Sequence, residues 1–328
     1  MLYIESPSHE PDFNLALEQY VFDQLPRCQE YFMLWQNQDA IIVGKHQNTA
    51  AEIDGAYVAK KGIRVVRRLS GGGAVYHDLG NINYTFIVDA KGAAIDFAAF
   101  CRLVVEALAS LGVTAEISGR NDITIGGKKF SGNAQYIKKS RVMHHGTIMF
   151  DSDLSALAAA LRVSPDKVRS KGVESVRSRV TNLREHLPAS LTLAQFWQVL
   201  HRFMVRKRAM ETYRLTAKDL AEVEALRVSR YATWEWNYGS SPPYSIRKER
   251  RVEGCGTIQL GLEVEKGILT AFSAQGDYFG SGDSSDLARL LVGRRLEEGE
   301  LKKALADLDV DHYFSNLTLE ELVEIILQ

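Results

Sequence analysis

A turn of three glycines, residues 71–73, stands within the stretch 64–84, between two short runs of strand-forming residues. Glycine reaches backbone angles that are closed to residues with a Cβ, so the main-chain N–H groups of such a turn can converge on one anion. Arg67 and Arg68 come directly before the turn and add fixed positive charge. Neighbouring strand residues point to opposite sides, so we expect one arginine in the site, and Arg68 is the nearer to the turn. The stretch therefore predicts an anion-binding site.

An ordinary glycine-rich hairpin turn is the alternative interpretation, and a run such as Ser-Gly-Gly-Gly is by itself more often a turn than a phosphate site. Neither G-x-G-x-x-G nor G-x-x-x-x-G-K-[ST] occurs in the chain, which disfavours Rossmann and P-loop nucleotide sites. A nucleotide site at this turn would therefore belong to a different fold.

Residues 119–134 carry the second group of candidate side chains. A strand, a Gly-Gly turn and a returning strand predict a hairpin here. Lys129 and Phe130 point to opposite faces of the returning strand, so one of the two adjacent lysines can be directed inward while the other stays solvated. Most lysines lie on the surface, but the small residues 131–134 leave room for a ligand along the strand.

Three further features bear on a ligand site. Residues 171–183 are rich in cations and hydroxyl groups, as expected of a loop that closes over an anion, although a solvated linker would look similar. Lys45 follows a buried strand, where a solvated loop is the commoner outcome. His144 and His145 are neighbours on a strand and face opposite ways, so we predict no zinc site.

The composition limits the class of protein. The chain has 328 residues, which favours two domains, and its 40 lysines and arginines against 41 acidic residues argue against a protein that coats nucleic acid. Cys28, Cys101 and Cys255 lie outside any C-x-x-C spacing, which fits reduced thiols better than disulfides or zinc. The first residues lack a leader pattern and no apolar stretch is long enough to span a bilayer, so we expect a cytoplasmic protein that binds no membrane.

Hydrophobic periodicity predicts the elements that position these residues. Expected helices cover 12–25, 96–111, 192–212, 217–226, 285–291, 300–308 and 318–327, and expected strands cover 31–35, 40–44, 82–88, 123–125, 128–134, 143–150 and short runs within 251–279. Aromatic, proline and serine residues at 234–244 indicate a domain boundary. We hypothesise that the basic run 247–251 helps to steer an acidic partner domain.

Five ordered motifs closely resemble those of lipoate-protein ligases. They are RRLSGGGAVYHDLGN at 67–81, GRND at 119–122, KFSGNA at 129–134, HHGT at 144–147 and the loop 171–183. The resemblance implies an α+β fold of mixed, mostly antiparallel sheets flanked by helices, as in biotin ligases and class II synthetases. It also implies a catalytic domain at 1–243 and a small α+β accessory domain at 244–328.

Ligases of this family make lipoyl-AMP from lipoate and ATP, and then pass the lipoyl group to a lysine of an acceptor protein. The resemblance therefore implies ATP, Mg²⁺ and lipoate as ligands. It implies apo lipoyl domains of 2-oxoacid dehydrogenase E2 subunits, or the glycine-cleavage H protein, as partners, and no nucleic acid. Cations and N–H donors would stabilise the charge that shifts onto phosphate oxygens when the carboxylate attacks the α-phosphorus.

The resemblance assigns roles motif by motif. Lys129 matches the family's lysine that touches the lipoyl carbonyl and the phosphate, and Asp122 would orient Lys129 or contact magnesium. The ATP and lipoyl-AMP site is expected at Arg68, Ser70, Gly71, Gly72, Gly73, Ala74, Val75, Tyr76, Asn81, Lys129, Ser131, Gly132, His145, Gly146, Thr147, Lys171 and Val173. Lys45 and Asn121 are weaker candidates, and no resident metal is expected.

Two alternatives to the ligase stay open. Octanoyltransferases of related fold move an acyl group from a carrier protein without ATP, and the bacterial kinds use a cysteine nucleophile, but no cysteine of this chain falls in the motifs. The other alternative is a protein that binds lipoyl-AMP without catalysis. Lys129 and the loop 171–183 argue against it.

Overall fold

The computed structural model describes residues 1–90, 97–119, 121–162, 179–242 and 244–328, and these form two compact units. The first unit spans 1–45, 66–158 and 163–232, and the second spans 46–65, 159–162 and 233–328. Two short segments of the N-terminal half therefore belong to the same unit as the C-terminal region. The boundary that the sequence predicts between residues 243 and 244 stays a prediction, because Pro243 lies outside the described residues.

An eight-stranded sheet forms the centre of the first unit. Its strands lie in the order β11-β1-β2-β6-β10-β9-β8-β7. They are β1 (Leu2–Glu5), β2 (Tyr31–Trp35), β6 (Asn81–Asp89), β7 (Glu116–Ser118), β8 (Asp122–Ile125), β9 (Lys128–Lys138), β10 (Arg141–Met149) and β11 (Glu211–Thr212). β1 is parallel to β2 and to β11, and the other neighbouring pairs are antiparallel. The mixed, mostly antiparallel sheet predicted from the sequence is confirmed.

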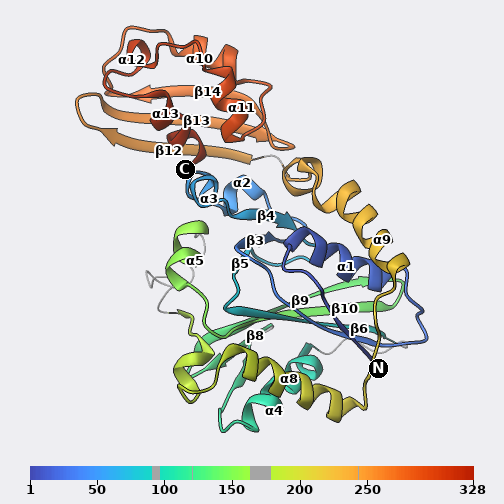
Figure 1. Cartoon of the computed structure of the whole chain (residues 1–328). Helices are drawn as coiled ribbons and strands as arrows, with labels where there is room; N and C mark the ends of the chain where they lie inside the picture. Colours follow the sequence, from blue (N-terminus) through green and yellow to red (C-terminus); the bar gives the residue numbers. More distant parts are fainter. Residues whose placement is uncertain (91–96, 120, 163–178, 243) are drawn as a thin grey trace. The chain divides into compact units, whose positions relative to one another are not determined.

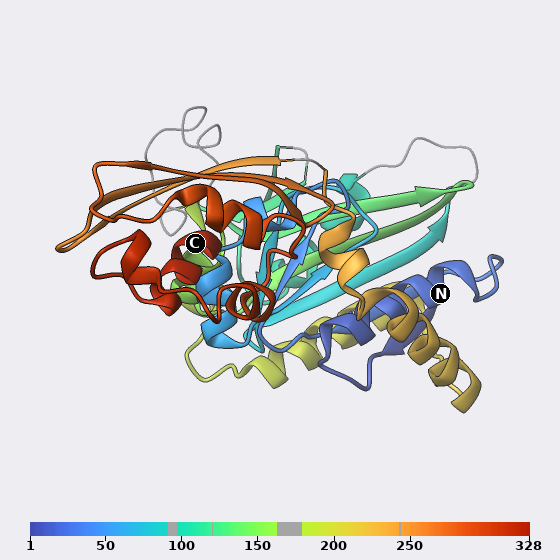
Figure 2. The same cartoon turned by 90° about the horizontal axis from the view of Figure 1, so that it is seen from above.

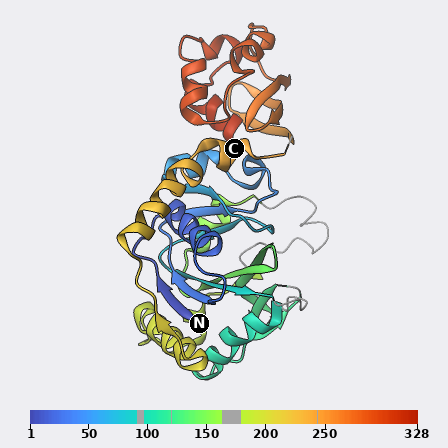
Figure 3. The same cartoon turned by 90° about the vertical axis from the view of Figure 1, so that its right-hand side faces the viewer.

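Helices lie on both faces of this sheet (Figures 1 and 3). They are α1 (Pro11–Asp23) on one face, with α9 (Ala217–Leu226) packed on it, and α4 (Phe97–Ala109) beside α8 (Leu193–Arg208) on the other. Strand alternation fixes the chemistry of each face. Phe86 packs with Phe32 and Phe196 in the apolar core under α4 and α8. Thr85, its neighbour, faces α1 and donates its hydroxyl to Glu18.

A second, three-stranded sheet presents the glycine turn. β3 (Ala40–Val43) lies between β4 (Arg64–Arg67) and β5 (Val75–His77). The two strands that flank the turn therefore pair with β3 from opposite sides, and the turn crosses the end of β3. A simple hairpin, the alternative interpretation of this stretch, is wrong. The crossing leaves the turn next to the residues that follow β3, with Lys45 N donating to Ser70 O at 2.9 Å.

Three antiparallel strands and a layer of helices form most of the second unit (Figure 2). They are β12 (Tyr244–Val252), β13 (Gly256–Glu265), β14 (Ile268–Gly276), α10 (Ser284–Leu291), α11 (Glu298–Ala304), α12 (Val310–Tyr313) and α13 (Leu319–Leu327), together with α2 (Thr49–Glu52) and α3 (Gly55–Lys61). Alternate residues of β13, such as Ile258, Leu260 and Leu262, pack under the helices. The predicted capping box of Thr318 with Glu321 begins α13.

Several element ends differ from the sequence prediction. The helix expected over 192–212 ends at Arg208, because Ala209 adopts a left-handed conformation with φ of 46°, and the chain returns as β11. The basic run 247–251 is part of β12, so its side chains alternate between the two faces of a sheet. The segment predicted as a linker holds the helical turn Glu235–Gly239. The helix start expected at Asp96 lies outside the described residues.

Shorter elements complete the chain. They are α5 (Leu154–Ala160), the 3₁₀ turn Leu183–His186 and the π-helical turn Arg227–Tyr231 that continues α9. Among the described residues, no helix combines the length and the apolar character that a membrane crossing requires.

Candidate active site

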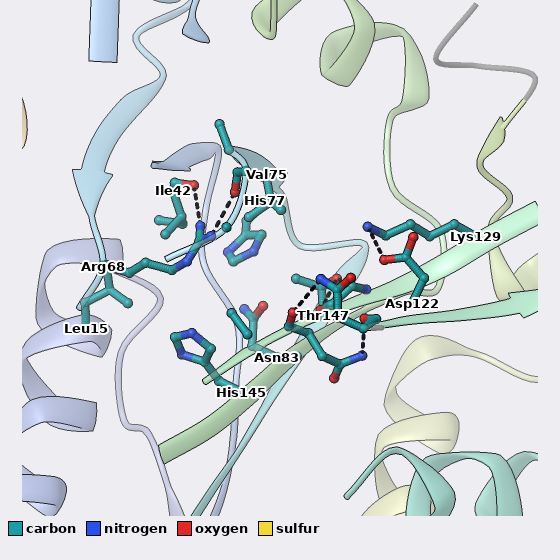
Figure 4. Close-up of a pocket in the computed structure, with 18 of the residues that line it drawn as sticks. Leu15, Ile42, Arg68, Val75, His77, Asn83, Asp122, Lys129, His145 and Thr147 are labelled. Atoms are coloured by element: carbon teal, nitrogen blue, oxygen red, sulfur yellow. Dashed lines mark hydrogen bonds and ion pairs between the residues drawn. The ribbon is translucent and has the colours of Figure 1, made fainter. Parts of the chain in front are cut away.

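A pocket of about 310 Å³ opens in the first unit beside the glycine turn (Figure 4). It brings together most of the residues that the sequence singled out. Those that line it are Arg68, Gly72, Gly73, Ala74, Val75, Asn121, Asp122, Lys129, Gly132, His145, Gly146 and Thr147. Segments that are far apart in the chain therefore meet at one cavity.

Lys129 and Asp122 form an ion pair in the wall of the pocket (Figure 4). The Lys129 Nζ lies 2.8 Å from Asp122 Oδ1, and about a third of each side chain is exposed. The two residues come from neighbouring strands, β9 and β8. Asp122 thus holds the ammonium of Lys129 while part of that side chain stays exposed. The role of Asp122 in the reaction stays a prediction.

A β-bulge and a glycine direct the Lys129 side chain. The pairing of β8 with β9 shifts by one residue between Ile123 and Thr124, which leaves Phe130 as the extra residue of β9. Phe130 is buried in the core, and Lys129 faces the cavity. A Cβ at Gly132 would lie 2.7 Å from the Lys129 Nζ, so the missing side chain provides the space that the amine occupies. Bulges of this kind re-aim side chains beside functional sites.

The predicted loop 171–183 ends against the same strand. Val180 forms a parallel β-bridge with Lys129, and Thr181 N donates to Lys129 O at 3.0 Å. Residues 163–178 lie outside the described residues. The end of the loop is therefore fixed to the backbone of the lysine on which the site depends.

Arg68 is buried in the pocket wall, and its guanidinium holds the glycine turn. Its Nη2 donates to Gly71 O at 2.6 Å and to Gly73 O at 2.8 Å. Its Nη1 donates to Ile42 O at 3.0 Å, and its Nε to Ser70 Oγ at 2.9 Å. Burial lowers the pKa of Arg68 to about 10, so the group stays charged near neutral pH. Arg68 therefore shapes the turn as well as adding charge.

Arg67 occupies the opposite side of the strand, as the alternation predicted. It is fully buried, and its Nη1 donates to Gly44 O at 2.9 Å and to Lys45 O at 3.1 Å. Gly44 approaches the glycine turn closely, since a Cβ there would lie 2.1 Å from Gly72 O. The two arginines thus hold two adjoining loops in contact, and only Arg68 lines the pocket.

His145 belongs to a connected polar network under the pocket. Its Nε2 lies 2.6 Å from Ser70 Oγ, and its Nδ1 lies 3.1 Å from Glu18 Oε1. The His145 Nδ1–H is directed at the Glu18 carboxylate, and Ser70 Oγ also accepts a bond from Arg68 Nε at 2.9 Å. Glu18 also accepts from Thr85 Oγ1. All members of this network are buried.

The remaining wall of the pocket is largely apolar. Leu15 of α1, Trp35 of β2 and Ile42 of β3 line it, and Trp35 Nε1 donates to Thr85 Oγ1 at 2.9 Å. His77 also lines the pocket, and burial, with a smaller effect of the Arg68 guanidinium, lowers its pKa to about 3, so the ring is neutral. Because Asn37 Nδ2 lies 3.1 Å from His77 Nδ1, the His77 proton resides on Nε2, which finds no partner among the described residues. The wall suits an apolar group that also accepts a hydrogen bond.

Family models match both parts of the chain. The model of the lipoyl protein ligase A/B catalytic domain matches residues 10–204, and the model of the bacterial lipoate protein ligase C-terminus matches residues 241–326. The lipoate-protein ligase LplJ of Bacillus subtilis is 43% identical over 99% of this chain and 100% of its own length. Lipoate–protein ligase 1 of Staphylococcus aureus is 42% identical over 97% of each chain. The chain belongs to the lipoate-protein ligase family.

Solved structures agree with this assignment. A bipartite lipoate protein ligase of Thermoplasma acidophilum, described with its E2 lipoyl domain, superposes with a TM-score of 0.65 at 27% identity, over 73% of this chain and 96% of that chain. A lipoate-protein ligase A structure bound with ATP superposes with a TM-score of 0.63 at 26% identity, over 73% of this chain and 98% of that chain. The ligase fold and the enzyme class predicted from the motifs are confirmed.

Some predicted site residues of the ligase lie behind the pocket wall. Ser70, Gly71, Tyr76, Asn81, Ser131 and Lys45 do not line the cavity, and Lys171 and Val173 lie outside the described residues. Ser70 still acts on the site through Arg68 and His145. Tyr76 points away from it, since its hydroxyl donates to Asp39 Oδ1 at 3.2 Å. Their assignment as ligand contacts stays a prediction.

Sequence reasoning missed several residues at the site. Leu15, Trp35, Ile42, His77, Asn83, Asn133 and Ala134 line the pocket, and Glu18 lies under it. Asn83 lies on the same face of β6 as Asn81 and accepts a bond from the Asn81 amide. The spacing of the two asparagines could have indicated this, since residues two apart share a face. The sequence carries no comparable signal for Glu18 or Trp35, which reach the site through tertiary packing.

Removing the Glu18 carboxylate should destabilise the first unit. In Glu18→Ala, the His145 N–H and the Thr85 O–H lose a buried acceptor, so we expect the free energy of unfolding to fall by about 2 kcal/mol. The measurement is urea unfolding monitored by tryptophan fluorescence, in which the midpoint should be lower than in the wild type. Glu18→Gln keeps one acceptor oxygen and should lose less than half as much. Equal midpoints for wild type and Glu18→Ala would contradict the network.

Proposed function

We propose that this ligase converts lipoate and MgATP to lipoyl-AMP and then transfers the lipoyl group to a lysine of an acceptor protein. The observation that carries the proposal is the pairing of chemistries in one pocket. Leu15, Trp35 and Ile42 offer an apolar wall to the chain and ring of lipoate, and Lys129 offers a cation to its carboxylate and to the α-phosphate. The ATP-bound relative of the same fold supports this assignment.

In the first step, two anionic groups must meet. The lipoate carboxylate attacks the α-phosphorus, the new C–O–P linkage forms and pyrophosphate leaves. The Lys129 ammonium, held by Asp122, would offset the repulsion and the charge that develops on phosphate oxygens. Mg²⁺ would enter with ATP. Within the described ranges no three His, Cys, Asp or Glu side chains are grouped so that they could hold a metal ion. The carboxylate in the pocket lining is that of Asp122.

In the second step, the acceptor lysine attacks the carbonyl of the mixed anhydride, an amide bond forms and AMP leaves. The enzyme needs no nucleophile for this reaction. In keeping with that, none of Cys28, Cys101 and Cys255 is among the residues that line the pocket. The acyltransferase alternative would need a cysteine at the site.

We propose lipoyl domains of 2-oxoacid dehydrogenase E2 subunits, the glycine-cleavage H protein, or both as acceptors. The archaeal relative that was studied together with an E2 lipoyl domain supports this class of partner. We also propose that residues 1–243 carry catalysis and 244–328 act as an accessory domain, which the separate family matches at 10–204 and 241–326 support.

The test is an acceptor-mass experiment. Purified apo lipoyl domain and apo H protein are incubated separately with the ligase, lipoate, Mg²⁺ and ATP, and their intact masses are followed. We expect a gain of one lipoyl group that requires ATP, with AMP formed in equal amount. The acceptor that is modified faster defines the preferred partner.

Two other outcomes would replace the proposal. Transfer of octanoyl from an acyl carrier protein without ATP would make the chain an acyltransferase. Tight binding of lipoyl-AMP without modification of either acceptor would make it a binding protein.

A further inference from the structure

A second pocket, of about 360 Å³, lies within the second unit and plays no part in the reaction described above. Its walls come from α2, α3, β12, the start of α11 and the end of α13. The lining residues are Ala50, Ile53, Gly55, Val58, Ala59, Gly62, Ile63, Tyr238, Lys248, Leu296, Glu297, Glu298 and Leu327. Most are apolar, and Lys248 is the one basic side chain among them.

Strand alternation turns Lys248 inward. On β12, Arg247 and Glu249 are exposed, whereas Ile246 and Lys248 lie on the face that the helices cover. Lys248 is only 8% exposed. Within the described residues its amine makes no hydrogen bond and no ion pair within 4 Å. A lysine that is nearly buried in an apolar pocket, with no counter-ion in contact, has its charged form disfavoured relative to water.

The charged groups around the pocket leave this amine without a counter-ion. Asp54 uses its carboxylate to accept the Tyr57 N–H at the start of α3, and Arg162 donates to Leu327 O at the end of α13. Burial lowers the pKa of Lys248 to about 7. The positive charge of Arg162 lowers it further by a smaller amount, and this effect exceeds the opposite effect of Asp54. Burial also raises the pKa of Glu297, the carboxylate that lines the pocket before α11, which weakens it as an anionic partner at moderately low pH.

We propose that Lys248 is a nucleophilic amine and a modification site for activated acyl groups of the acyl-phosphate anhydride class. A lysine that is desolvated in an apolar pocket beside another cation is the pattern of an activated amine nucleophile. The apolar walls at Ile53, Val58 and Leu296 suit the hydrocarbon part of the acyl group. Such anhydrides have two sources: acyl phosphates in solution, and the acyl adenylate that this enzyme makes, the latter resting on the proposed function.

The modification is a simple acyl transfer. The Lys248 nitrogen attacks the acyl carbonyl carbon, a C–N bond forms, and the C–O bond of the anhydride breaks with its electron pair leaving on phosphate or AMP. The amine loses one proton to water, and the product is an amide. At pH 7 a substantial fraction of an amine with a pKa of about 7 is neutral, against roughly one in 2,500 for an ordinary lysine.

The test uses the full chain with a reagent present below one equivalent. Acetyl phosphate in one arm and chemically prepared lipoyl adenylate in another are added without ATP, and the modified lysines are located by peptide mass spectrometry. We expect Lys248 to react at least about tenfold faster than exposed lysines at pH 7, because its larger neutral fraction outweighs its lower basicity. Its rate should level off above about pH 7, while the rates of exposed lysines keep rising toward pH 10.

Variants and a third arm separate the possible sources. Lys248→Met, which matches the apolar walls in shape, should lose this label, and the exposed control Lys303→Arg should keep it. In the third arm the ligase works with ATP and lipoate but without acceptor. Label in that arm supports the enzyme's own adenylate as a source, and label in the first two arms alone supports anhydrides from solution.

Reaction of Lys248 no faster than exposed lysines in the arms without ATP would overturn the proposal, whether or not the ligase assay succeeds. A rate at Lys248 that rises only above pH 9 would overturn it too. Failure of the proposed function would instead show as an unmodified acceptor protein, with the labelling by acetyl phosphate unaffected.

Discussion

Replacing Lys129 with methionine is expected to lower the rate of acceptor lipoylation at least about 100-fold, the size typical of losing one charged group that stabilises a transition state. Lys129 is the cation in the pocket lining whose amine is held by a single carboxylate, Asp122 at 2.8 Å, rather than by several backbone carbonyls. It therefore keeps donors available for a ligand. Methionine fills the same space without the charge, so the fold should be retained.

The measurement compares the two half-reactions. Adenylate formation is followed by pyrophosphate release without acceptor, and transfer is followed from prepared lipoyl-AMP. Lys128→Met is the matched control, because Lys128 is adjacent on β9 but exposed and outside the pocket lining. We expect near-wild-type rates for the control and a loss mainly in adenylate formation for Lys129→Met. Equal rates in the two variants would remove Lys129 from the chemistry.

The sequence predicted this part of the site because its signals are local. The alternation of Lys129 with Phe130 predicted that the two side chains face opposite ways and that one lysine of the adjacent pair is directed inward. In the structure Lys129 lines the cavity, Phe130 is buried in the core and Lys128 is exposed. The same rule separated Arg67 from Arg68 and predicted opposite faces for His144 and His145. His145 is hydrogen-bonded to Glu18 and Ser70, whereas the His144 ring stacks on the Phe100 ring with 4.6 Å between the ring centroids. Strand period and residue type suffice for such predictions.

Long-range packing accounts for what the sequence did not predict. Glu18 comes from α1, a helix that is buried on nearly all sides, and Trp35 comes from the fully apolar strand β2. Packing of α1 on the sheet brings Glu18 under the pocket, and the position of β2 beside β6 brings Trp35 into the pocket lining. The second unit likewise draws residues 46–65 and 159–162 from the other half of the chain. Lys248 of this unit lies within the basic run 247–251, where the charge pattern alone does not show which side chain faces the interior.

Arg68 shows how the role of a residue can be broader than its charge. The glycine turn was expected to present backbone donors to an anion, with Arg68 beside it as a positive charge. In the structure the guanidinium of Arg68 bonds the carbonyls of Gly71 and Gly73 on the turn and that of Ile42 on β3. The three carbonyls accept from two different guanidinium nitrogens, Nη1 and Nη2, and a planar fork with several N–H donors can satisfy all of them at once.

Substitution of Arg68 is therefore expected to be costly even when the charge is kept. Arg68→Met leaves the buried Ile42 carbonyl and the partly buried carbonyls of the turn without these donors, and it should destabilise the first unit by about 2 kcal/mol or more, measured as a fall in the urea midpoint. Arg68→Lys keeps the charge, but its single ammonium cannot reach all the acceptors. We therefore expect its loss of stability to be more than half of the loss in Arg68→Met. The affinity for ATP should fall at least tenfold in Arg68→Lys, because the turn is no longer held in shape.

The two variants together decide between the two roles of Arg68. If charge alone mattered, Arg68→Lys would bind ATP and unfold like the wild type, and only Arg68→Met would be impaired. If the fork holds the turn, both variants lose stability and ATP affinity, and Glu18→Gln, which alters the same network away from the turn, leaves ATP affinity nearly unchanged. We expect the second pattern, since the Arg68 donors are directed to the protein's own carbonyls and to Ser70.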